Sequence, residues 1–489
     1  MSPAPCETLA ELFLARAAEH ASRPFLITEE GVATYAEVLE DAWKIAAWIT
    51  ASGVEPGAHI ATLLPNGRPY VTSLFGAILA GTVAVPLDPR LRAPEVRFLA
   101  QHCRCRALIT GAPQAPSIDL QSCHVVAYLE ALSAAASATQ QPTRHRNAQD
   151  PAVILATSGS TAAPKAVVLS HRSLLTNQRS VGALYGFSAG DVLLTALSLF
   201  HSFGLTACLL AAVDRGAAVI LPPDVQPARL AALSARHGAT IFLATASLYP
   251  YLVRGAAPAE SFRGVRHFLS GAATLHEATA AGFRERFGRD IVQTYGLTEA
   301  SPVVTANPPH DNRTGTVGPA LPGVELRVVD GELLVRGATV MLGYLDNPSA
   351  TTACLGEDGW LATGDLARID AAGYVTLLGR KKDLILRGGE KIFPEEVEEA
   401  LRRHPDVADV AVVGLADPAF EEVPAAFIVP REPGAALDIA SLDAHCRREL
   451  APFKVPRRYL AIAMLPRNPN GKVLKRELRD LLARPSGEA

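Results

Sequence analysis

The chain has 489 residues, of which 49% are hydrophobic and 19% are charged, and its formal net charge is −3. This length is too great for one ordinary domain, so we expect at least two domains. The near-neutral charge excludes the strong basic field of a general nucleic-acid-binding protein.

The N-terminal stretch MSPAPCETLAELFLARAAEH carries charged residues within its apolar pattern, unlike a signal peptide. No uncharged window is long enough to span a bilayer. The sequence therefore predicts a cytoplasmic protein with no integral membrane segment and no nucleic-acid partner. Of seven scattered cysteines, Cys103 and Cys105 form the only close pair, and no second pair completes a zinc set. We expect reduced thiols with mainly structural roles.

The first segment with a chemical signal is ILATSGSTAAPKAVVLSH, residues 154–171, in which a strand-like run opens into small and hydroxylated residues. A Walker loop needs a second glycine directly before its lysine and a hydroxyl directly after it. Here Pro164 and Ala166 flank Lys165, so a Walker-type nucleotidase is disfavoured. The loop still offers a cation and four hydroxyls that can donate to phosphate oxygens, on Thr157, Ser158, Ser160 and Thr161. An ordinary Ser/Thr loop is the alternative for this segment alone.

Strand-like and helical segments alternate further along the chain. Apolar runs occupy residues 217–222, 239–244, 265–270 and 289–294. The helical patterns between them include LHEATAAGFRERFG, which Gly288 should end. This alternation indicates βαβ units and a mostly parallel sheet.

Small or polar residues follow each of these strands. The segments are TAS (245–247), GAA (271–273) and YGLTE (295–299), and the loop 157–165 also follows a strand-like run. Ligands of such sheets bind outside the carboxyl ends of the strands, so we expect these loops to converge on one crevice. For any one loop alone, an ordinary turn is the simpler interpretation.

The residue pattern of the sequence changes after residue 315. Glycines and short strand-like pieces up to residue 380 indicate a β-rich subdomain, and GRKKD (379–383) is a charged connector. Beyond it come a helix that Pro394 begins and further strands. The sequence thus predicts an α/β fold: a large N-terminal domain with mostly parallel sheets plus a β-rich subdomain, and a small α+β C-terminal domain.

Five motifs occur in order: TSGSTAAPKAVVLSH, YGLTE, TGDLARID, GRKKDLILRGGEKIFPEEVE and NPNGKVLKREL. Together they resemble the adenylate-forming superfamily of acyl-CoA synthetases, adenylation domains and luciferases, closest to stand-alone acyl-CoA or acyl-carrier-protein ligases. The resemblance implies that ATP converts a carboxylic acid to an acyl-adenylate, from which a thiol displaces AMP. It also implies an adenylation core over 1–379, a hinge at 380–382 around Lys382, and a mobile domain over 383–489.

The resemblance assigns roles around YGLTE. Glu299 matches the magnesium ligand, and a carboxylate oxygen is what Mg²⁺ prefers. Thr298 should contact a phosphate, and Tyr295 should lie against the adenine. The rest of the nucleotide site is assigned to Gly271, Ala272, Ala273 and Gly296.

Later motifs supply further roles by the same resemblance. Asp365 matches the ribose-binding carboxylate, and Arg380 should assist it. Lys472 matches the lysine that bridges the attacking carboxylate and the α-phosphate, presented by a tight turn at Asn470-Gly471. Gly388 and Gly389 should let a pantetheine arm pass close to the backbone, and a plain Gly-Gly hairpin turn is the alternative.

The segment LSLFHSFGLT (197–206) bears on the acid. Amino-acid adenylation domains usually carry an aspartate here, whereas this chain has His201 and no carboxylate between Asp191 and Asp214. Because an unpaired buried ammonium is costly, we expect a fatty or aryl acid without an α-amino group. Around the catalytic candidate His201, the expected acyl-pocket residues are Phe203, Gly204, Ala244, Thr245, Gly271, Ala272 and residues 301–304. A structural role for His201 is the alternative.

Two alanines depart from the family pattern, which usually has glycine where Ala162 and Ala166 stand. If those positions need φ > 0, the loop is strained. The expected cofactors are ATP, Mg²⁺ and coenzyme A, or in place of CoA the phosphopantetheine of a carrier protein. A non-catalytic acyl- or nucleotide-binding protein is the alternative of another class.

Overall fold

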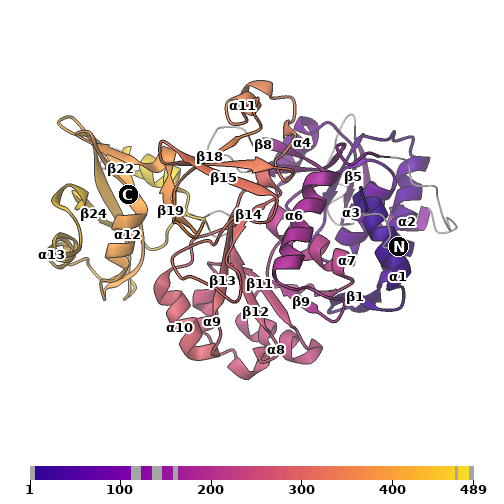
Figure 1. Ribbon diagram of the computed structural model, residues 1–489, viewed down its shortest axis with the longest axis horizontal. Coiled ribbons are helices and arrows are strands. Elements are labelled where there is room, and N and C mark those ends of the chain that lie inside the picture. The colour runs from indigo at the N-terminus through magenta and orange to yellow at the C-terminus, as the bar shows by residue number, and fades with distance from the viewer. Residues whose placement is uncertain (1–5, 112–122, 135–145, 158–163, 468–471, 484–489) are drawn as a thin grey trace. The chain divides into compact units, whose positions relative to one another are not determined.

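The computed structural model describes residues 6–111, 123–157, 164–467 and 472–483, apart from 135–145 (Figure 1). The chain forms two compact units. The first unit comprises residues 1–326 and 335–361, and the second comprises 327–334 and 362–489.

The first unit contains an eight-stranded sheet within the described residues. Its strands, in spatial order, are β14 (Val303–Ala306), β13 (Ile291–Gly296), β12 (His267–Gly271), β11 (Ile241–Thr245), β9 (Val192–Thr195), β10 (Ala218–Ile220), β1 (Pro24–Thr28) and β2 (Gly31–Thr34). The strands from β13 to β1 are parallel, and only β14 and β2 pair antiparallel with their neighbours. The four predicted strands are β10, β11, β12 and β13, so the predicted parallel sheet is confirmed.

A seven-stranded sheet is the second layer of this unit. In order, its strands are β17 (Gly343–Tyr344), β8 (Lys165–Ser170), β7 (Pro151–Thr157), β4 (Val83–Pro86), β3 (His59–Leu63), β5 (Cys105–Thr110) and β6 (His124–Ala127). The antiparallel pair of β7 and β8 places Thr157 opposite Lys165. The predicted phosphate loop therefore connects two adjacent strands.

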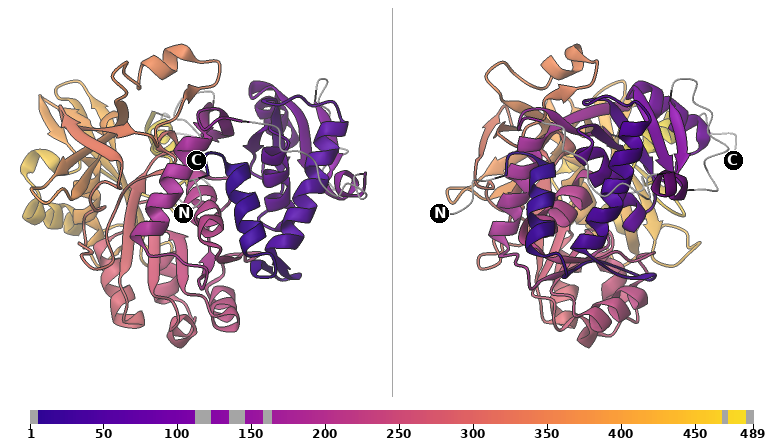
Figure 2. Two further views of the ribbon diagram at one scale, coloured as in Figure 1. Left: turned by 45° about the vertical axis from the view of Figure 1, so that its right-hand side comes forward. Right: turned by 90° about the vertical axis from the view of Figure 1, so that its right-hand side faces the viewer.

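A layer of helices lies between these two sheets (Figure 2). It contains α1 (Leu9–Glu19), α2 (Tyr35–Ala51), α3 (Arg68–Leu79), α6 (His171–Leu184) and α7 (Ala211–Arg215). Helices α2 and α7 contact the eight-stranded sheet, α3 and α6 contact the seven-stranded sheet, and α2 packs on α3 and α6 on α7. The close approach of α2 to α3 requires Gly76, because a Cβ there would lie 2.6 Å from the Cβ of Ile45.

Helices also cover the outer faces of both sheets. Next to the eight-stranded sheet lie α8 (Pro227–His237), α9 (Tyr249–Arg254) and α10 (Glu277–Phe287). They bury an aromatic core in which Phe242 and Phe268 pack against Tyr249 and Phe283. Helix α4 (Ala93–His102) packs on the seven-stranded sheet, and α5 (Tyr128–Ala134) packs beside α2. Helix α10 ends at Gly288 in a left-handed conformation, with φ of 63°, which confirms the predicted helix end.

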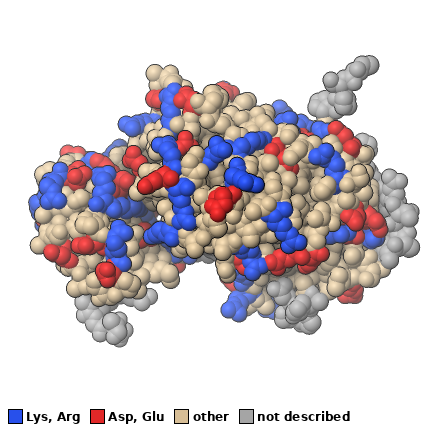
Figure 3. Space-filling model, turned by 90° about the horizontal axis from the view of Figure 1, so that it is seen from below, with Lys and Arg blue, Asp and Glu red and all other residues tan. Residues whose placement is uncertain are grey.

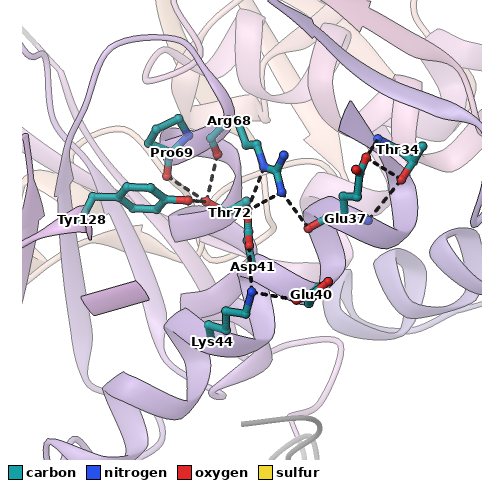
Figure 4. Close-up of polar contacts among 9 residues, drawn as sticks. All are labelled: Thr34, Glu37, Glu40, Asp41, Lys44, Arg68, Pro69, Thr72 and Tyr128. Carbon is teal, nitrogen blue, oxygen red and sulfur yellow. Dashed lines mark hydrogen bonds and ion pairs between the residues drawn. The ribbon is translucent and has the colours of Figure 1, made fainter. Parts of the chain in front are cut away.

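A buried charge links α2 to α3 (Figure 4). Asp41 on α2 is only 7% exposed. Its carboxylate accepts a hydrogen bond from Arg68 Nε at 2.8 Å and lies 3.4 Å from Lys44 Nζ, which also pairs with Glu40 at 2.7 Å. Lys44 lies on α2 itself, so the pairing of Asp41 with Arg68 is what joins α2 to α3.

Replacing Asp41 with asparagine should lower the free energy of unfolding by about 1–3 kcal/mol, because Arg68 and Lys44 lose a buried ionised acceptor. Urea denaturation followed by tryptophan fluorescence measures the loss. Glu40→Gln is the matched control, since it removes an exposed partner of the same lysine and should cost less than about 1 kcal/mol. Equal losses in both variants would contradict this assignment.

A four-stranded sheet contains the boundary between the units. Its order is β15 (Val324–Val329), β16 (Glu332–Gly337), β18 (Leu361–Ile369) and β19 (Val375–Arg380). These strands confirm the predicted β-rich region. The short helix α11 (Pro348–Thr352) belongs to the first unit.

The second unit has its own five-stranded sheet. It contains β21 (Glu390–Ile392), β20 (Ile385–Arg387), β23 (Glu421–Pro430) and β22 (Val407–Asp417), and β24 (Arg458–Ala461) also pairs with β23. With it pack α12 (Pro394–Arg402), α13 (Ile439–Glu449) and α14 (Lys475–Ala483). Helix α12 begins at Pro394, as predicted. The α/β fold with a smaller α+β C-terminal part is confirmed.

The predicted hinge at 380–382 falls inside the second unit, where β19 ends and a 3₁₀ turn covers Lys381–Asp383. A hinge there stays a prediction. Acidic and basic side chains are interspersed on the face shown in Figure 3, in line with the small net charge. Within the described ranges, no helix combines the length and apolar character needed to cross a bilayer.

Candidate active site

The carboxyl ends of β11, β12 and β13 lie side by side, as predicted. Thr245 pairs with Gly271 across β11 and β12, and Ser270 pairs with Gln293 across β12 and β13. The segments TAS, GAA and YGLTE therefore leave the sheet side by side, at the carboxyl ends of these strands. The carboxyl ends of the strands are where a doubly wound sheet binds its ligands.

The ring of Phe203 lies against Gly271, the last residue of β12. A Cβ at this glycine would lie 2.8 Å from the ring of Phe203. Phe203 begins a buried π-helix, Phe203–Leu210, an irregular helix that often occurs at functional sites. The next residue, Ala272, is exposed and has φ of 65°, a strained conformation for a residue with a Cβ. Ala273 is half-buried.

The start of the YGLTE loop requires glycine. A Cβ at Gly296 would lie 1.7 Å from the carbonyl oxygen of Pro302. The preceding residue, Tyr295, is buried. Its stacking on adenine stays a prediction. The hydroxyls of Thr298 and Ser202 lie 3.2 Å apart. The loop thus brings Thr298 beside the segment that carries His201.

Glu299 and Lys165, predicted from separate motifs, meet at Tyr344. The Tyr344 hydroxyl donates to Oε1 of Glu299 at 2.8 Å, and the Lys165 ammonium lies 4.5 Å from the centre of the tyrosine ring. Burial, and then the charge of Glu299, raise the pKa of Tyr344 well above its usual range, so its hydroxyl stays protonated. Sequence reasoning missed Tyr344, because the motif GYL carries no chemical signal by itself.

These residues fit a nucleotide with a bound Mg²⁺. Glu299 is half-buried and offers a hard oxygen ligand, and Lys165 is a cation at the end of the phosphate loop. The described residues contain no cluster of three or more His, Cys, Asp or Glu that could hold a metal by itself. One carboxylate beside a phosphate site is the usual protein contribution to Mg²⁺ that phosphates also hold.

In the second unit, the structure brings together three predicted residues from three motifs. Asp365 on β18 and Arg380 on β19 are paired in register and form an ion pair of 2.8 Å. Burial of its ammonium and the nearby Arg380 charge lower the pKa of Lys472 to about 8, and Asp365 opposes that shift. Lys472 as a whole is nevertheless exposed. A carboxylate and two cations here could bind a sugar hydroxyl and anionic groups.

Gly388 and Gly389 form the turn between β20 and β21, with φ of 55° and 85°. Two positive φ values in a two-residue hairpin loop explain both glycines, which confirms the hairpin reading. Their role toward a pantetheine arm stays a prediction.

The His201 ring packs beside the Phe200 ring, with the two ring centroids 4.5 Å apart. The Nε2 atom of His201 is buried and has no hydrogen-bond partner among the described residues. Burial lowers the pKa of His201 to about 4, with Asp88 opposing the shift and Arg90 adding to it. The ring is therefore neutral at pH 7. An unpaired buried nitrogen is costly in a folded protein, which favours a ligand contact over a satisfied structural histidine.

The nearby carboxylate of Asp88 was not predicted. It accepts hydrogen bonds from Arg90 Nε at 2.8 Å and from Arg90 NH2 at 2.7 Å. Burial alone would raise the pKa of Asp88, but these bonds hold it below its usual range. The anion near His201 is therefore already paired.

Several residues predicted for the site lie in other surroundings or outside the residues that the structure describes. Ala244 packs in the core with Phe242, on the opposite face of β11 from Thr245, and its place in an acyl pocket stays a prediction. Ala166 lies in regular pairing within β8 with no positive φ, so the predicted strain does not arise there. Outside the described residues are the side chain of Thr157 and the whole of Ser158, Ser160, Thr161, Ala162, Asn470 and Gly471.

Known proteins share this architecture over nearly the whole chain. Sulfoacetate–CoA ligase of Cupriavidus necator is 34% identical over 96% of this chain and 97% of its own, and long-chain-fatty-acid–CoA ligase of Bacillus subtilis is 30% identical over 97% and 95%. ATP-bound MatB of Rhodopseudomonas palustris has a TM-score of 0.90 at 30% identity, over 96% and 98%. An anthranilate CoA ligase in complex with anthranoyl-AMP also has 0.90, at 25% identity over 97% of each chain.

Family models match both parts of the sequence. The AMP-binding enzyme model matches residues 13–345, and the model of the AMP-binding enzyme C-terminal domain matches residues 396–472. The first match alone covers more than half of the chain and includes Lys165, Glu299 and Tyr344. The predicted resemblance is confirmed: this chain belongs to the AMP-binding enzyme family.

Proposed function

We propose that this chain is an AMP-forming acid–CoA ligase that activates a fatty or aryl acid without an α-amino group. The observation that supports the reaction most directly is the cluster at Tyr344, which holds Glu299 and Lys165 beside the phosphate-loop strands. An anionic metal ligand and a phosphate-binding cation in one place are what a phosphate-transfer site needs. The CoA ligases among the relatives add to this support.

In the first step, a carboxylate oxygen of the acid attacks the α-phosphorus of ATP. The new P–O bond forms as the bond to pyrophosphate breaks, which gives acyl-AMP and pyrophosphate. Lys165 offsets negative charge on the departing pyrophosphate, and Asp365 accepts from the ribose hydroxyls with Arg380 beside it. Lys472 offsets the charge that builds up where the two anions meet. Such positioning and neutralisation can supply most of the rate.

Mg²⁺ is the metal that this proposal requires. Glu299 would be its protein ligand, and the chemistry that the metal would supply is neutralisation of charge on the phosphate oxygens.

In the second step, the CoA sulfur attacks the acyl carbonyl carbon. The bond to AMP breaks, the thiol proton goes to solvent, and the products are acyl-CoA and AMP. We propose that residues 383–489 turn about 380–382 between the steps, so that the hairpin at Gly388 and Gly389 replaces Lys472 near the acyl group. A cytoplasmic location suits a reaction that draws on ATP and CoA.

The acid class rests on the surroundings of His201. This ring is neutral, the Phe200 ring centroid lies 4.5 Å from its own, and the nearby Asp88 is paired with Arg90. Such a site can contact an uncharged acyl group, whereas an ammonium would have to compete with Arg90 for the Asp88 carboxylate. The named relatives act on sulfoacetate and long-chain fatty acids, so likeness alone does not select one acid.

The direct test incubates the purified protein with ATP, Mg²⁺ and a panel of straight-chain and aryl acids. Parallel reactions contain CoA or an acyl carrier protein bearing phosphopantetheine, and mass spectrometry identifies the acyl products. Acyl-CoA and AMP from at least one acid would support the proposal. Acylated carrier protein without acyl-CoA would favour the second acceptor. Nucleotide binding without any acyl product would favour a non-catalytic binding protein.

An α-amino acid should be a poor substrate compared with the same acid lacking the amine. Leaving a buried polar group unpaired costs about 1–3 kcal/mol, and a charge costs more. This corresponds to roughly a tenfold to hundredfold loss in kcat/KM. Pyrophosphate release with hexanoate and 2-aminohexanoate, or with phenylacetate and phenylglycine, compares the two classes at nearly constant size.

Asp88 supplies the control for this comparison. If the amino acids react as well as their deaminated partners, Asp88, whose charge acts on His201, is a candidate partner for their ammonium, and Asp88→Asn should then reduce their use selectively. Comparable turnover of the amino acids would contradict the proposed acid class, although the ligase reaction itself would stand.

A further inference from the structure

Tyr344 occupies an unusual position between two predicted phosphate-site groups of opposite charge. It lies in β17, opposite Val167 of β8, the strand that follows the phosphate loop. Backbone hydrogen bonds on both sides hold this register: Leu342 N–H donates to Val168 and Leu345 N–H donates to Ala166, at 2.9 and 2.8 Å. The strand that carries Tyr344 is thus fixed against the strand that begins with Lys165.

The same segment is also fixed to Glu299. The Met341 N–H donates to the backbone carbonyl of Glu299 at 2.8 Å, and the Tyr344 hydroxyl donates to its carboxylate at the same distance. The Tyr344 N–H in turn donates to Thr351 Oγ1 at 2.9 Å, and the residue is only 9% exposed. A buried side chain whose backbone N–H and hydroxyl are both hydrogen-bonded can fix the direction in which a carboxylate points.

We infer that Tyr344 is a positioning residue that holds the Glu299 carboxylate for Mg²⁺ through its hydroxyl and the Lys165 ammonium for phosphate through its ring. The two functions belong to different parts of one side chain. The hydroxyl acts on the metal ligand, and the face of the ring attracts the cation. This inference rests on the proposed function, because it requires that Glu299 meets Mg²⁺ with a bound nucleotide.

Two substitutions separate these functions. Tyr344→Phe keeps the ring under Lys165 and removes the hydroxyl, with its hydrogen bond to Glu299 and its contact with the Cys354 thiol. Tyr344→Leu removes both the ring and the hydroxyl. Cys354→Ala, which removes only the thiol, should leave the magnesium response unchanged. Nucleotide affinity is measured without acid or CoA, by titration calorimetry with ATP, once in Mg²⁺ and once in EDTA, so that no turnover contributes.

In the Phe variant, the gain in ATP affinity that Mg²⁺ brings should fall by about tenfold, the lower end of the usual effect of losing a partner of a metal ligand. Its affinity in EDTA should stay as in the wild type. The Leu variant should also lose about twofold to tenfold in EDTA, because the ring no longer attracts the ammonium. Tyr249→Phe is the matched control, since it removes a buried hydroxyl that donates to Leu269 at 2.9 Å in the same unit. It should leave both affinities unchanged.

A double-mutant cycle tests whether Tyr344 acts through Glu299. Adding Tyr344→Phe to Glu299→Gln should change the magnesium response little further. A full additional loss, or a Phe variant with the wild-type magnesium response in a protein that makes acyl-CoA, overturns the inference and leaves the proposed function intact. Wild-type protein that binds no ATP overturns the proposed function, and this inference with it. Should Tyr344→Phe fail to fold, Tyr344→Leu provides the test. The gain in ATP affinity that Mg²⁺ brings over EDTA should fall by about tenfold in this variant, and an unchanged gain overturns the inference.

Discussion

Replacing Lys472 with alanine should abolish formation of the acyl-adenylate while leaving thioester formation from supplied acyl-adenylate and CoA largely intact. Two anions meet in the first step, and a cation placed at their junction stabilises the charge that develops there. Losing such a group usually costs on the order of 10²–10³-fold in rate. The second step has no such meeting of anions. Pyrophosphate release measures the first half-reaction, and acyl-CoA formation measures the second.

The lowered pKa of Lys472 adds a pH dependence to this expectation. Since the pKa is about 8, the ammonium loses its proton as the pH rises through that value, and adenylation by the wild type should fall there. The thioester half-reaction should not follow the same curve. Arg476→Ala is the control, because it removes an exposed cation four residues further along the chain. Equal loss of both half-reactions in Lys472→Ala would contradict a lysine that serves only the first step.

Glu299→Gln should reduce turnover by on the order of a hundredfold at low Mg²⁺ and leave folding unaffected. The amide keeps an oxygen that can accept from Tyr344, but the anionic oxygen that Mg²⁺ prefers is lost. Part of the activity should return as Mg²⁺ is raised, because the phosphates still hold the metal. A magnesium titration of pyrophosphate release, beside a thermal unfolding curve, measures both effects.

Glu277→Gln provides the comparison for this variant. Glu277 is an exposed acid in the first turn of α10, in the same unit, and its loss should leave the magnesium titration unchanged. Unchanged activity of Glu299→Gln across the titration would show that Glu299 is not the ligand. A fall in activity that no concentration of Mg²⁺ relieves, together with a lower unfolding temperature, would point to a structural role instead.

The sequence by itself determined the parallel strands β10 to β13 of the first unit, because local patterns carry that information. Apolar runs of strand length alternate with amphipathic segments, and the small residues after each run mark where the strands end. The Gly288 helix end and the Pro394 helix start follow from the conformational limits of these two residues. The ordered motifs, through the family resemblance, likewise singled out Lys165, Glu299, Asp365 and Lys472 as candidates before any contact was known.

Only the tertiary structure decided which side chains meet. Tyr344 lies 45 residues from Glu299 in sequence, and Asp88 lies far from His201, so no local pattern predicts either neighbour. Burial and orientation also depend on the assembled sheets, which is why Ala244 faces the core and Lys472 acquires a lowered pKa. Short-range periodicity specifies a residue's face on its own strand or helix, whereas partners and desolvation depend on how distant strands are paired and packed.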